Sequence, residues 1–221
     1  MNTLLESKRV WDLPTRAFHW LLLIGVVLQF GTGKLGWLSM QWHFWSGYAL
    51  LTLLLFRMFW GFFGSENVRL RGLLVGPRRV FEYLRQWSNT PMSRFAGHNP
   101  AGAWATLLML LVLLVQALSG LFSSDEIEWF GPLARWIPDR AVAFATWVHR
   151  RGESVILALI ALHVLAVALY WFVKRENLVA GMWHGRRNIE VTAPRLTGNG
   201  RDLLMLAISA ALVAGSIALA E

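Results

Sequence analysis

The chain has 221 residues, of which 56% are apolar and 15% are charged. This composition excludes an ordinary soluble domain and is typical of a protein that crosses a membrane several times. The formal net charge is +8, but the basic residues lie between long apolar runs, so the charge indicates membrane topology and not nucleic-acid binding. The absence of cysteine excludes disulfides, thiolate-ligated iron–sulfur clusters and covalent attachment of haem within the chain.

Five apolar runs approach the roughly 20 residues that a helix needs to cross the core of a bilayer. In chain order they are Phe18–Thr32, Phe44–Phe63, Ala101–Phe122, Ser154–Phe172 and Leu203–Ala220. The first run has no small-residue cleavage site, so we interpret it as a retained helix and not as a signal peptide. The fifth is rich in Ala and Ser and contains no histidine. We favour a spanning helix there over a hydrophobic tail packed beside the others.

The distribution of lysine and arginine predicts the orientation of these spans. Fifteen of the 21 basic residues lie in the N-terminal segment, the second loop and the fourth loop. Five lie in the first and third loops, and Arg57 lies within the second span. Because basic loops stay in the cytoplasm, we expect a multi-pass protein of the bacterial inner membrane with a cytoplasmic N-terminus. The third loop, which is mildly acidic, is then outside, as a small cap, a docking surface or a plain connector.

Histidines inside or beside the spans are candidates for function, because a histidine within a membrane is costly. The alternative for each is a hydrogen bond to a neighbouring helix. His149 and His163 are 14 residues apart, which on one helix returns to within roughly 40° of the same face and rises about 21 Å. If that helix begins just after Pro138 and continues through Gly152, it presents one histidine toward each membrane surface. The six histidines are His19, His43, His98, His149, His163 and His184.

The depths of four of these histidines predict two pairs. By the charge-based topology, His43 and His149 lie toward the outer surface, whereas His19 and His163 lie toward the cytoplasm. Two separated pairs on facing helices do not suit zinc, which wants four clustered ligands. They suit two haems, since each iron needs two axial ligands from opposite sides. We therefore predict an outer haem held by His43 and His149 and an inner haem held by His19 and His163.

Two further groups of residues fit this interpretation. Arg16 and Arg150, with Arg151, lie next to the predicted ligands and are candidates to bind haem propionates; the alternative is interfacial snorkelling. Small residues in the spans let a flat macrocycle approach the backbone, although ordinary helix packing explains each of them equally well. These are Gly25, Gly31, Gly33, Gly47, Gly102 and Gly120.

Several stretches resemble the prokaryotic cytochrome b561 family, which is related to the b-type cytochrome subunit of nickel–iron hydrogenases. They are VWDLPTRAFHW (10–20), WHFWSGYALLTLLLFRMFWGFFGS (42–65), GPRRVFEYL (76–84), GHNPAGA (97–103), LHV (162–164) and RENLVAGMWHGRR (175–187). The resemblance implies an all-α fold, an integral membrane four-helix bundle enclosing two b haems. The ligands that it implies are the same four histidines. Two departures are that Arg150 stands where a Glu often follows the histidine, and that the chain continues after Arg187.

The expected organisation is a cytochrome bundle over residues 1–187, followed by a cytoplasmic linker and a C-terminal hydrophobic helix over 188–221. His98 is a candidate neighbour of the inner haem's propionates or of a quinone, although a capping or packing role is the simpler explanation. His184 falls in a basic loop, where we expect it to be solvated.

The expected function is electron transfer between quinone and a redox partner through two b haems. The partner would be a cytochrome c, a dehydrogenase or another membrane subunit. One alternative is a stand-alone superoxide:quinone oxidoreductase, whose anionic substrate would be attracted by basic residues near the outer haem. Another is a non-redox membrane subunit, against which the paired histidines argue. The sequence shows no inverted repeat of the kind that transporters use.

Overall fold

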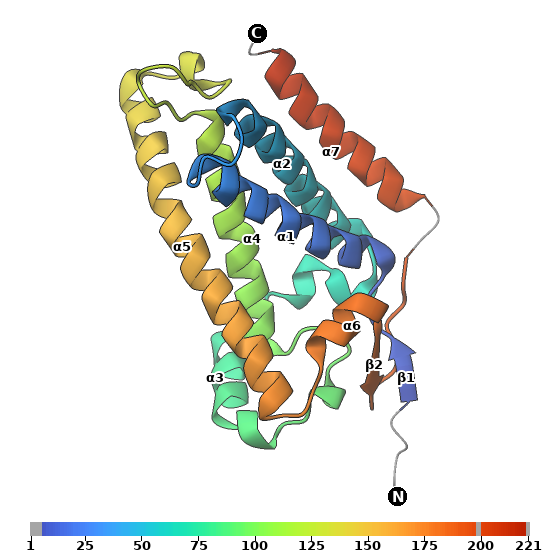
Figure 1. The fold of residues 1–221 in the computed structure, drawn as a ribbon. Helices are drawn as coiled ribbons and strands as arrows, with labels where there is room; N and C mark the ends of the chain where they lie inside the picture. Colours follow the sequence, from blue (N-terminus) through green and yellow to red (C-terminus); the bar gives the residue numbers. More distant parts are fainter. Residues whose placement is uncertain (1–5, 198–199, 220–221) are drawn as a thin grey trace, which may run out of the picture. The chain divides into compact units, whose positions relative to one another are not determined.

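Five long helices dominate the computed structural model, which describes residues 6–197 and 200–219. Each is long and apolar enough to cross a membrane. They confirm the predicted fold class, with a fifth helix after the four of the bundle (Figure 1). The last residue of the predicted fifth span, Ala220, lies outside the described residues. These helices are α1 (Leu13–Gly33), α2 (Met40–Phe63), α4 (Pro100–Leu121), α5 (Asp139–Phe172) and α7 (Arg201–Ala218).

Shorter elements connect the long helices. Two short α-helices are α3 (Pro77–Arg85) and α6 (Leu178–His184), and the strands are β1 (Glu6–Arg9) and β2 (Arg186–Ile189). Five single 3₁₀ turns are Glu66–Val68, Leu70–Gly72, Trp87–Asn89, Met92–Arg94 and Ala134–Trp136.

Sequence signals mark where the long helices begin. The Asp12 carboxylate accepts a hydrogen bond from Thr15 N at 2.8 Å and so caps α1. Asn99 accepts one from Gly102 N at 2.8 Å, just before Pro100 opens α4. Helix α5 begins directly after Pro138 and runs unbroken for 34 residues. His149 and His163 therefore lie on one helix, as predicted.

The chain forms two compact units, and the long helices contribute residues to both. The first unit comprises residues 1–18, 57–108 and 160–202. In it, β1 and β2 pair antiparallel, with Glu6 opposite Ile189; Figure 1 shows the two strands side by side. This sheet was not predicted from the sequence. The core of the unit includes Trp60, Val68 and Ile189, each at most 1% exposed.

The second unit comprises residues 19–56, 109–159 and 203–221. Its buried core joins Leu51 of α2, Leu121 of α4 and Val213 of α7. Helix α7 is thus packed against the helices of this unit through part of its surface, and Ser209 is fully buried. The domain division predicted at residue 187 stays a prediction.

The third loop has its own internal order. Asp125 Oδ1 accepts hydrogen bonds from the backbone N–H groups of Ile127, Glu128 and Trp129 at 2.8–3.1 Å. Gly131 N donates to Ser123 O at 2.7 Å and closes the loop. The backbone hydrogen bonds to the Asp125 carboxylate lower its pKa. This segment therefore has an ordered backbone, and its role as a cap, a docking surface or a connector stays a prediction.

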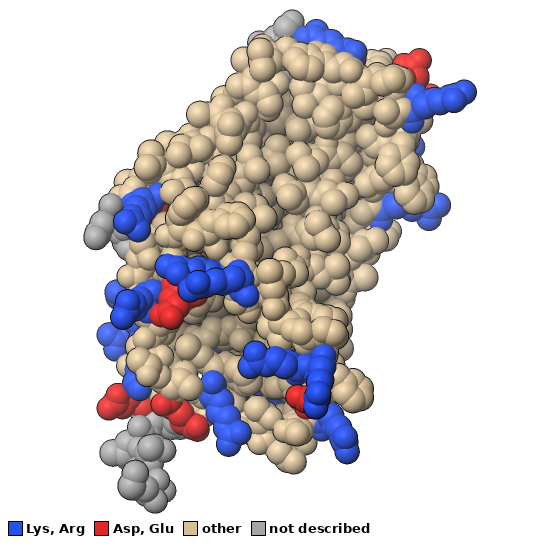
Figure 2. Space-filling model, turned by 180° about the vertical axis from the view of Figure 1, so that it is seen from behind, with Lys and Arg blue, Asp and Glu red and all other residues tan. Residues whose placement is uncertain are grey.

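Many large apolar side chains face outward on the long helices, among them Ile24, Leu111 and Leu165, which are each more than half exposed. Against water such exposure would be costly, whereas against lipid it is the expected state. On the face in Figure 2, the charged side chains are few against a broad uncharged surface. This surface agrees with a protein embedded in a bilayer.

Candidate functional site

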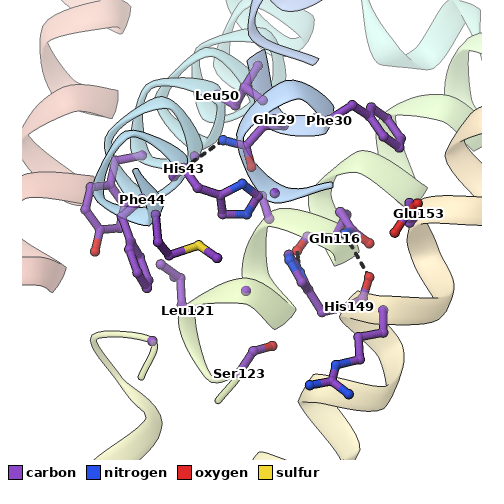
Figure 3. Close-up of a pocket in the computed structure, with 18 of the residues that line it drawn as sticks. Gln29, Phe30, His43, Phe44, Leu50, Gln116, Leu121, Ser123, His149 and Glu153 are labelled. Carbon is purple, nitrogen blue, oxygen red and sulfur yellow. Dashed lines mark hydrogen bonds between the residues drawn. The ribbon is translucent and has the colours of Figure 1, made fainter. Parts of the chain in front are cut away.

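The imidazoles of His43 and His149 face one another in the second unit. Their ring centroids are 6.2 Å apart and their planes are at 89°. A metal–imidazole bond is about 2 Å long, and a centroid lies roughly 1 Å behind its nitrogen, so two rings on one iron have centroids roughly 6 Å apart. Both histidines line a cavity of about 380 Å³ with mostly apolar walls. Figure 3 shows them on α2 and α5.

Hydrogen bonds identify the tautomer of His43. Its Nδ1 lies 3.2 Å from Thr32 Oγ1. The Thr32 hydroxyl donates its own proton to Leu28 O at 2.7 Å. The Thr32 oxygen is therefore the acceptor, and Nδ1 of His43 carries the proton. The lone pair of Nε2 is left for another partner.

His149 has the same tautomer for a different reason. Its Nδ1 lies 3.0 Å from the carbonyl oxygen of Gln116. Because a carbonyl only accepts, Nδ1 of His149 must donate. Metal-bound histidines characteristically give the proton of the other ring nitrogen to a carbonyl or similar acceptor. Both rings are thus prepared to bind a metal through Nε2.

Two of the predicted small residues adjoin these rings. A methyl group at Gly33 would stand 2.7 Å from Cε1 of His43, and one at Gly120 would stand 2.9 Å from Cε1 of His149. Only glycine allows such close approach here. Their role is therefore to seat the imidazoles. The donor set, the ring separation and the cavity fit a haem iron with two axial histidines.

Charged residues also line the cavity. Arg150 lines it, as the propionate interpretation requires, and its side chain is largely exposed. Lys34 and Glu153 line it as well and form an ion pair at 3.1 Å. Glu153 was not among the predicted site residues.

The second predicted pair belongs to different units. His19 lies on α1 within the second unit, and His163 lies on α5 within the first. Their pairing stays a prediction. Arg16 lies in the first unit, where its Nη1 donates to Trp183 O at 2.6 Å. Its Nε is buried without a hydrogen-bond partner among the described residues.

His98 and His184 have different surroundings. Burial, together with the nearby positive charges of Arg57 and Arg187, lowers the pKa of His98 to about 4, so its ring is neutral at pH 7. The His98 ring contacts Trp11 edge-to-face at 5.1 Å. His184 ends α6 and is exposed.

Several polar residues of the spans, in both units, were not predicted from the sequence as functional candidates. Arg57 is only 3% exposed, its Nη2 donates to Val68 O at 3.0 Å, and its Nη1 has no partner within the described part of the chain. The signal for all of them was available, because polar residues inside apolar spans are functional candidates. The others are Gln29, Thr32, Gln116 and Ser119.

The family model and the relatives that match this chain agree on one family. The family model of prokaryotic cytochrome b561 matches residues 10–185, which ends before α7. A probable Ni/Fe-hydrogenase B-type cytochrome subunit of Rhizobium leguminosarum bv. viciae is 23% identical over 222 residues, covering 82% of this chain and 89% of that protein. Subunits of the same name from Azotobacter vinelandii and Azotobacter chroococcum mcd 1 are 23% and 22% identical, covering 84% of this chain and 90% of each.

The matched residues include helices α1, α2, α4 and α5, and the family implies that the group held in the protein is haem b. A multi-pass b-type cytochrome of this kind serves in electron transfer. This chain therefore belongs to the prokaryotic cytochrome b561 family.

Proposed function

We propose that this protein carries electrons between a quinone in the bilayer and a redox partner through two b haems. His43 and His149 would hold the outer haem, and His19 and His163 the inner one. The observation that carries the proposal is the opposed pair His43 and His149, both protonated on Nδ1 and 6.2 Å apart between ring centroids.

When bound, haem supplies reversible one-electron oxidation and reduction of its iron. The residues of the chain do the rest. Two imidazoles on one iron would leave no open position for oxygen, which would favour electron transfer over oxygen chemistry. The mostly apolar walls of the cavity would keep water from a bound haem, and the hydrogen bonds to Thr32 and Gln116 hold each ring in one orientation.

The propionates need positively charged partners in or near the membrane. For the outer haem we propose Arg150, which lines the same cavity as His43. For the inner haem we propose Arg16 and, in addition, Arg57. A buried guanidinium without a full set of acceptors is costly unless an anion compensates it, and a propionate is such an anion.

A hydrogenase is the proposed partner. The relatives are named as B-type cytochrome subunits of Ni/Fe-hydrogenases, and they align over 82–84% of this chain. By the charge asymmetry of the loops, we propose an inner-membrane location with the N-terminus in the cytoplasm. The ordered loop around Asp125 is then on the outer side, beside the outer haem, where a soluble partner would dock.

The superoxide alternative has weaker support. It requires a positive field near the outer haem. Lys34, one of the five basic residues available for that field, is paired with Glu153 at 3.1 Å. Acidic residues of the third loop, including Asp125, reduce the field further.

Haem quantitation of the purified protein, with addition of a quinol, tests the proposal. We expect two b haems per chain by pyridine haemochrome assay and reduction of both by the quinol. One haem per chain would refute the second pair, and haems that no quinol or quinone reduces or oxidises would refute the quinone link.

A further inference from the structure

One five-residue pattern occurs at the ends of two helices. The segment Gln29–Gly33 reads QFGTG and ends α1, whereas Gln116–Gly120 reads QALSG and ends one residue before α4 does. Both are Gln-x-x-Ser/Thr-Gly. We call the two segments the α1 cradle and the α4 cradle.

The two cradles make the same contacts with different histidines. In each, the glutamine Nε2 donates to the backbone carbonyl of the histidine, at 2.8 Å for His43 and 2.9 Å for His149; Figure 3 marks both bonds. In each, the hydroxyl oxygen lies near Nδ1, at 3.2 Å and 3.4 Å. In each, the glycine lies against Cε1 of the ring. Three matching contacts at one spacing indicate a common device for holding an imidazole.

A glycine on the second histidine helix leaves room for the Gln116 side chain. A methyl group at Gly152 would stand 2.0 Å from Gln116 Oε1, whereas one at Gly47 would stand at an ordinary contact distance of 3.6 Å from Gln29 Nε2. Gly152 thus leaves space for the Gln116 amide beside α5, which continues through this glycine as a helix.

The cradles differ in the hydrogen bond that they accept from the imidazole. His149 Nδ1 has two acceptors, the Gln116 carbonyl at 3.0 Å and the Ser119 hydroxyl at 3.4 Å. Within the described chain, His43 Nδ1 has the Thr32 hydroxyl at 3.2 Å as the acceptor that meets ordinary hydrogen-bond geometry, and the Gln29 backbone adds a further interaction with the ring. Loss of the hydroxyl should therefore affect His43 more than His149, whose bond to the Gln116 carbonyl at 3.0 Å remains.

We propose that Thr32 and Ser119 are positioning residues that tune the reduction potential of the outer haem through the two imidazoles. The inference rests on the proposed function, in which His43 and His149 bind one iron. An acceptor on Nδ1–H increases the basicity of the ligand. A more basic imidazole stabilises the oxidised iron, so the acceptor lowers the potential.

Redox titration of the purified holoprotein tests this, with Thr32→Val as the first variant. The change keeps the shape of the side chain and removes the hydroxyl acceptor of His43 Nδ1–H. We expect about a tenfold change in the ratio of oxidised to reduced outer haem at a fixed potential, which is a 59 mV rise for one electron. Thr32→Ser should restore the wild-type value.

Thr52→Val is the matched control. Thr52 is also on a helix of this unit, and its hydroxyl donates a hydrogen bond to a backbone carbonyl four residues earlier, Tyr48 O at 2.9 Å. Among the residues that the structure describes, it forms no hydrogen bond with an imidazole. The reduction potential of the outer haem in Thr52→Val should equal that in the wild type. If Thr32→Val lost the outer haem while Thr32→Ser and Thr52→Val kept it, the positioning role would be supported equally.

Ser119→Ala is the second variant, with Ser216→Ala as its control because Ser216 also bonds a backbone carbonyl. The rise in the reduction potential of the outer haem should be smaller than in Thr32→Val, since the Gln116 carbonyl remains.

The electron paramagnetic resonance spectrum gives an independent readout, because nearly perpendicular imidazole planes produce a strongly anisotropic low-spin ferric signal. Release of one ring in Thr32→Val should change that anisotropy.

The outcomes separate this inference from the proposed function. If Thr32→Val and Ser119→Ala bind haem and match the wild type in potential and spectrum, the cradle proposal is overturned while the ligand assignment stands. If the wild-type protein binds no haem, or if His43→Ala and His149→Ala affect different haems, the proposed function itself fails.

Discussion

The carboxylate of Asp12 accepts a hydrogen bond from the indole nitrogen of Trp60 at 3.0 Å, and both residues are buried. The other carboxylate oxygen caps α1 by accepting from Thr15 N. One side chain thus joins the start of α1 to the end of α2. It also provides an acceptor for a tryptophan that has no exposed surface.

Asp12→Ala should lower the free energy of unfolding by about 2–4 kcal/mol, through loss of the cap and an unpaired buried indole N–H. The measurement is chemical unfolding in detergent. Asp139→Ala is the control, because Asp139 stands exposed in the first turn of α5. Equal losses in the two variants would contradict the role given to Asp12.

A second prediction concerns Tyr170, whose hydroxyl oxygen accepts from Asn99 Nδ2 at 2.9 Å and from Trp87 Nε1 at 3.1 Å. With two donors on its oxygen, Tyr170 donates its own proton to Tyr83, 2.5 Å away. Burial raises the pKa of Tyr83. Tyr170→Phe leaves both N–H donors without this acceptor, so it should lower the free energy of unfolding by about 2–4 kcal/mol. Tyr83→Phe should lower it by about 1 kcal/mol. A reversed order in unfolding experiments would refute this network.

A third prediction concerns Gly185, which has φ +75° and accepts hydrogen bonds from the N–H groups of Val10 and Trp11. A methyl group there would stand 2.7 Å from Trp11 O. Gly185→Ala should loosen the N-terminal strand, seen as faster hydrogen exchange at Val10 and Trp11.

Gly36→Ala is the matched comparison for Gly185→Ala. Gly36 has φ +63°, and a methyl group there would meet nothing within 4 Å. Both substitutions carry the left-handed backbone penalty of roughly 1–2 kcal/mol. Any greater loss of unfolding free energy in Gly185→Ala therefore measures the steric overlap. Similar stabilities of the two variants would show that the overlap is relieved without cost.

The fourth prediction is a pH dependence of the third loop. Because backbone hydrogen bonds lower the pKa of Asp125 in the folded state, the loop is stabilised above the unfolded value of about 4. That contribution is lost as the pH falls below this value through the folded pKa. Amide signals of Ile127 and Trp129 should therefore shift in acid. Asp125→Asn should remove the shift, and an unchanged response in that variant would assign it to another group.

The membrane helices were predictable because lipid requires long, continuous apolar segments with internally paired backbones. The proximity of His43 to His149 was predictable for a related reason, since each histidine lies at a helix position whose depth follows from the loop charges. The structure places the two ring centroids 6.2 Å apart, and their binding of one haem iron stays a prediction. The partnership of His19 and His163 remains a prediction.

Other features depend on contacts that hydropathy does not encode. Strands β1 and β2 join residues about 180 positions apart through backbone groups, and their sequences are mostly polar. The order of the third loop depends on Asp125, whose neighbours give no periodic signal. The two cradles could have been found by comparing Gln29–Gly33 with Gln116–Gly120, but only the structure shows that each contacts a histidine.

Redox titration of haem-loaded His43→Ala and His149→Ala tests the central claim most directly. Both variants should lose the same haem transition and keep the other, because each removes one axial ligand of a single iron. His19→Ala and His163→Ala should both affect the remaining transition. Loss of different haems in His43→Ala and His149→Ala would contradict the account.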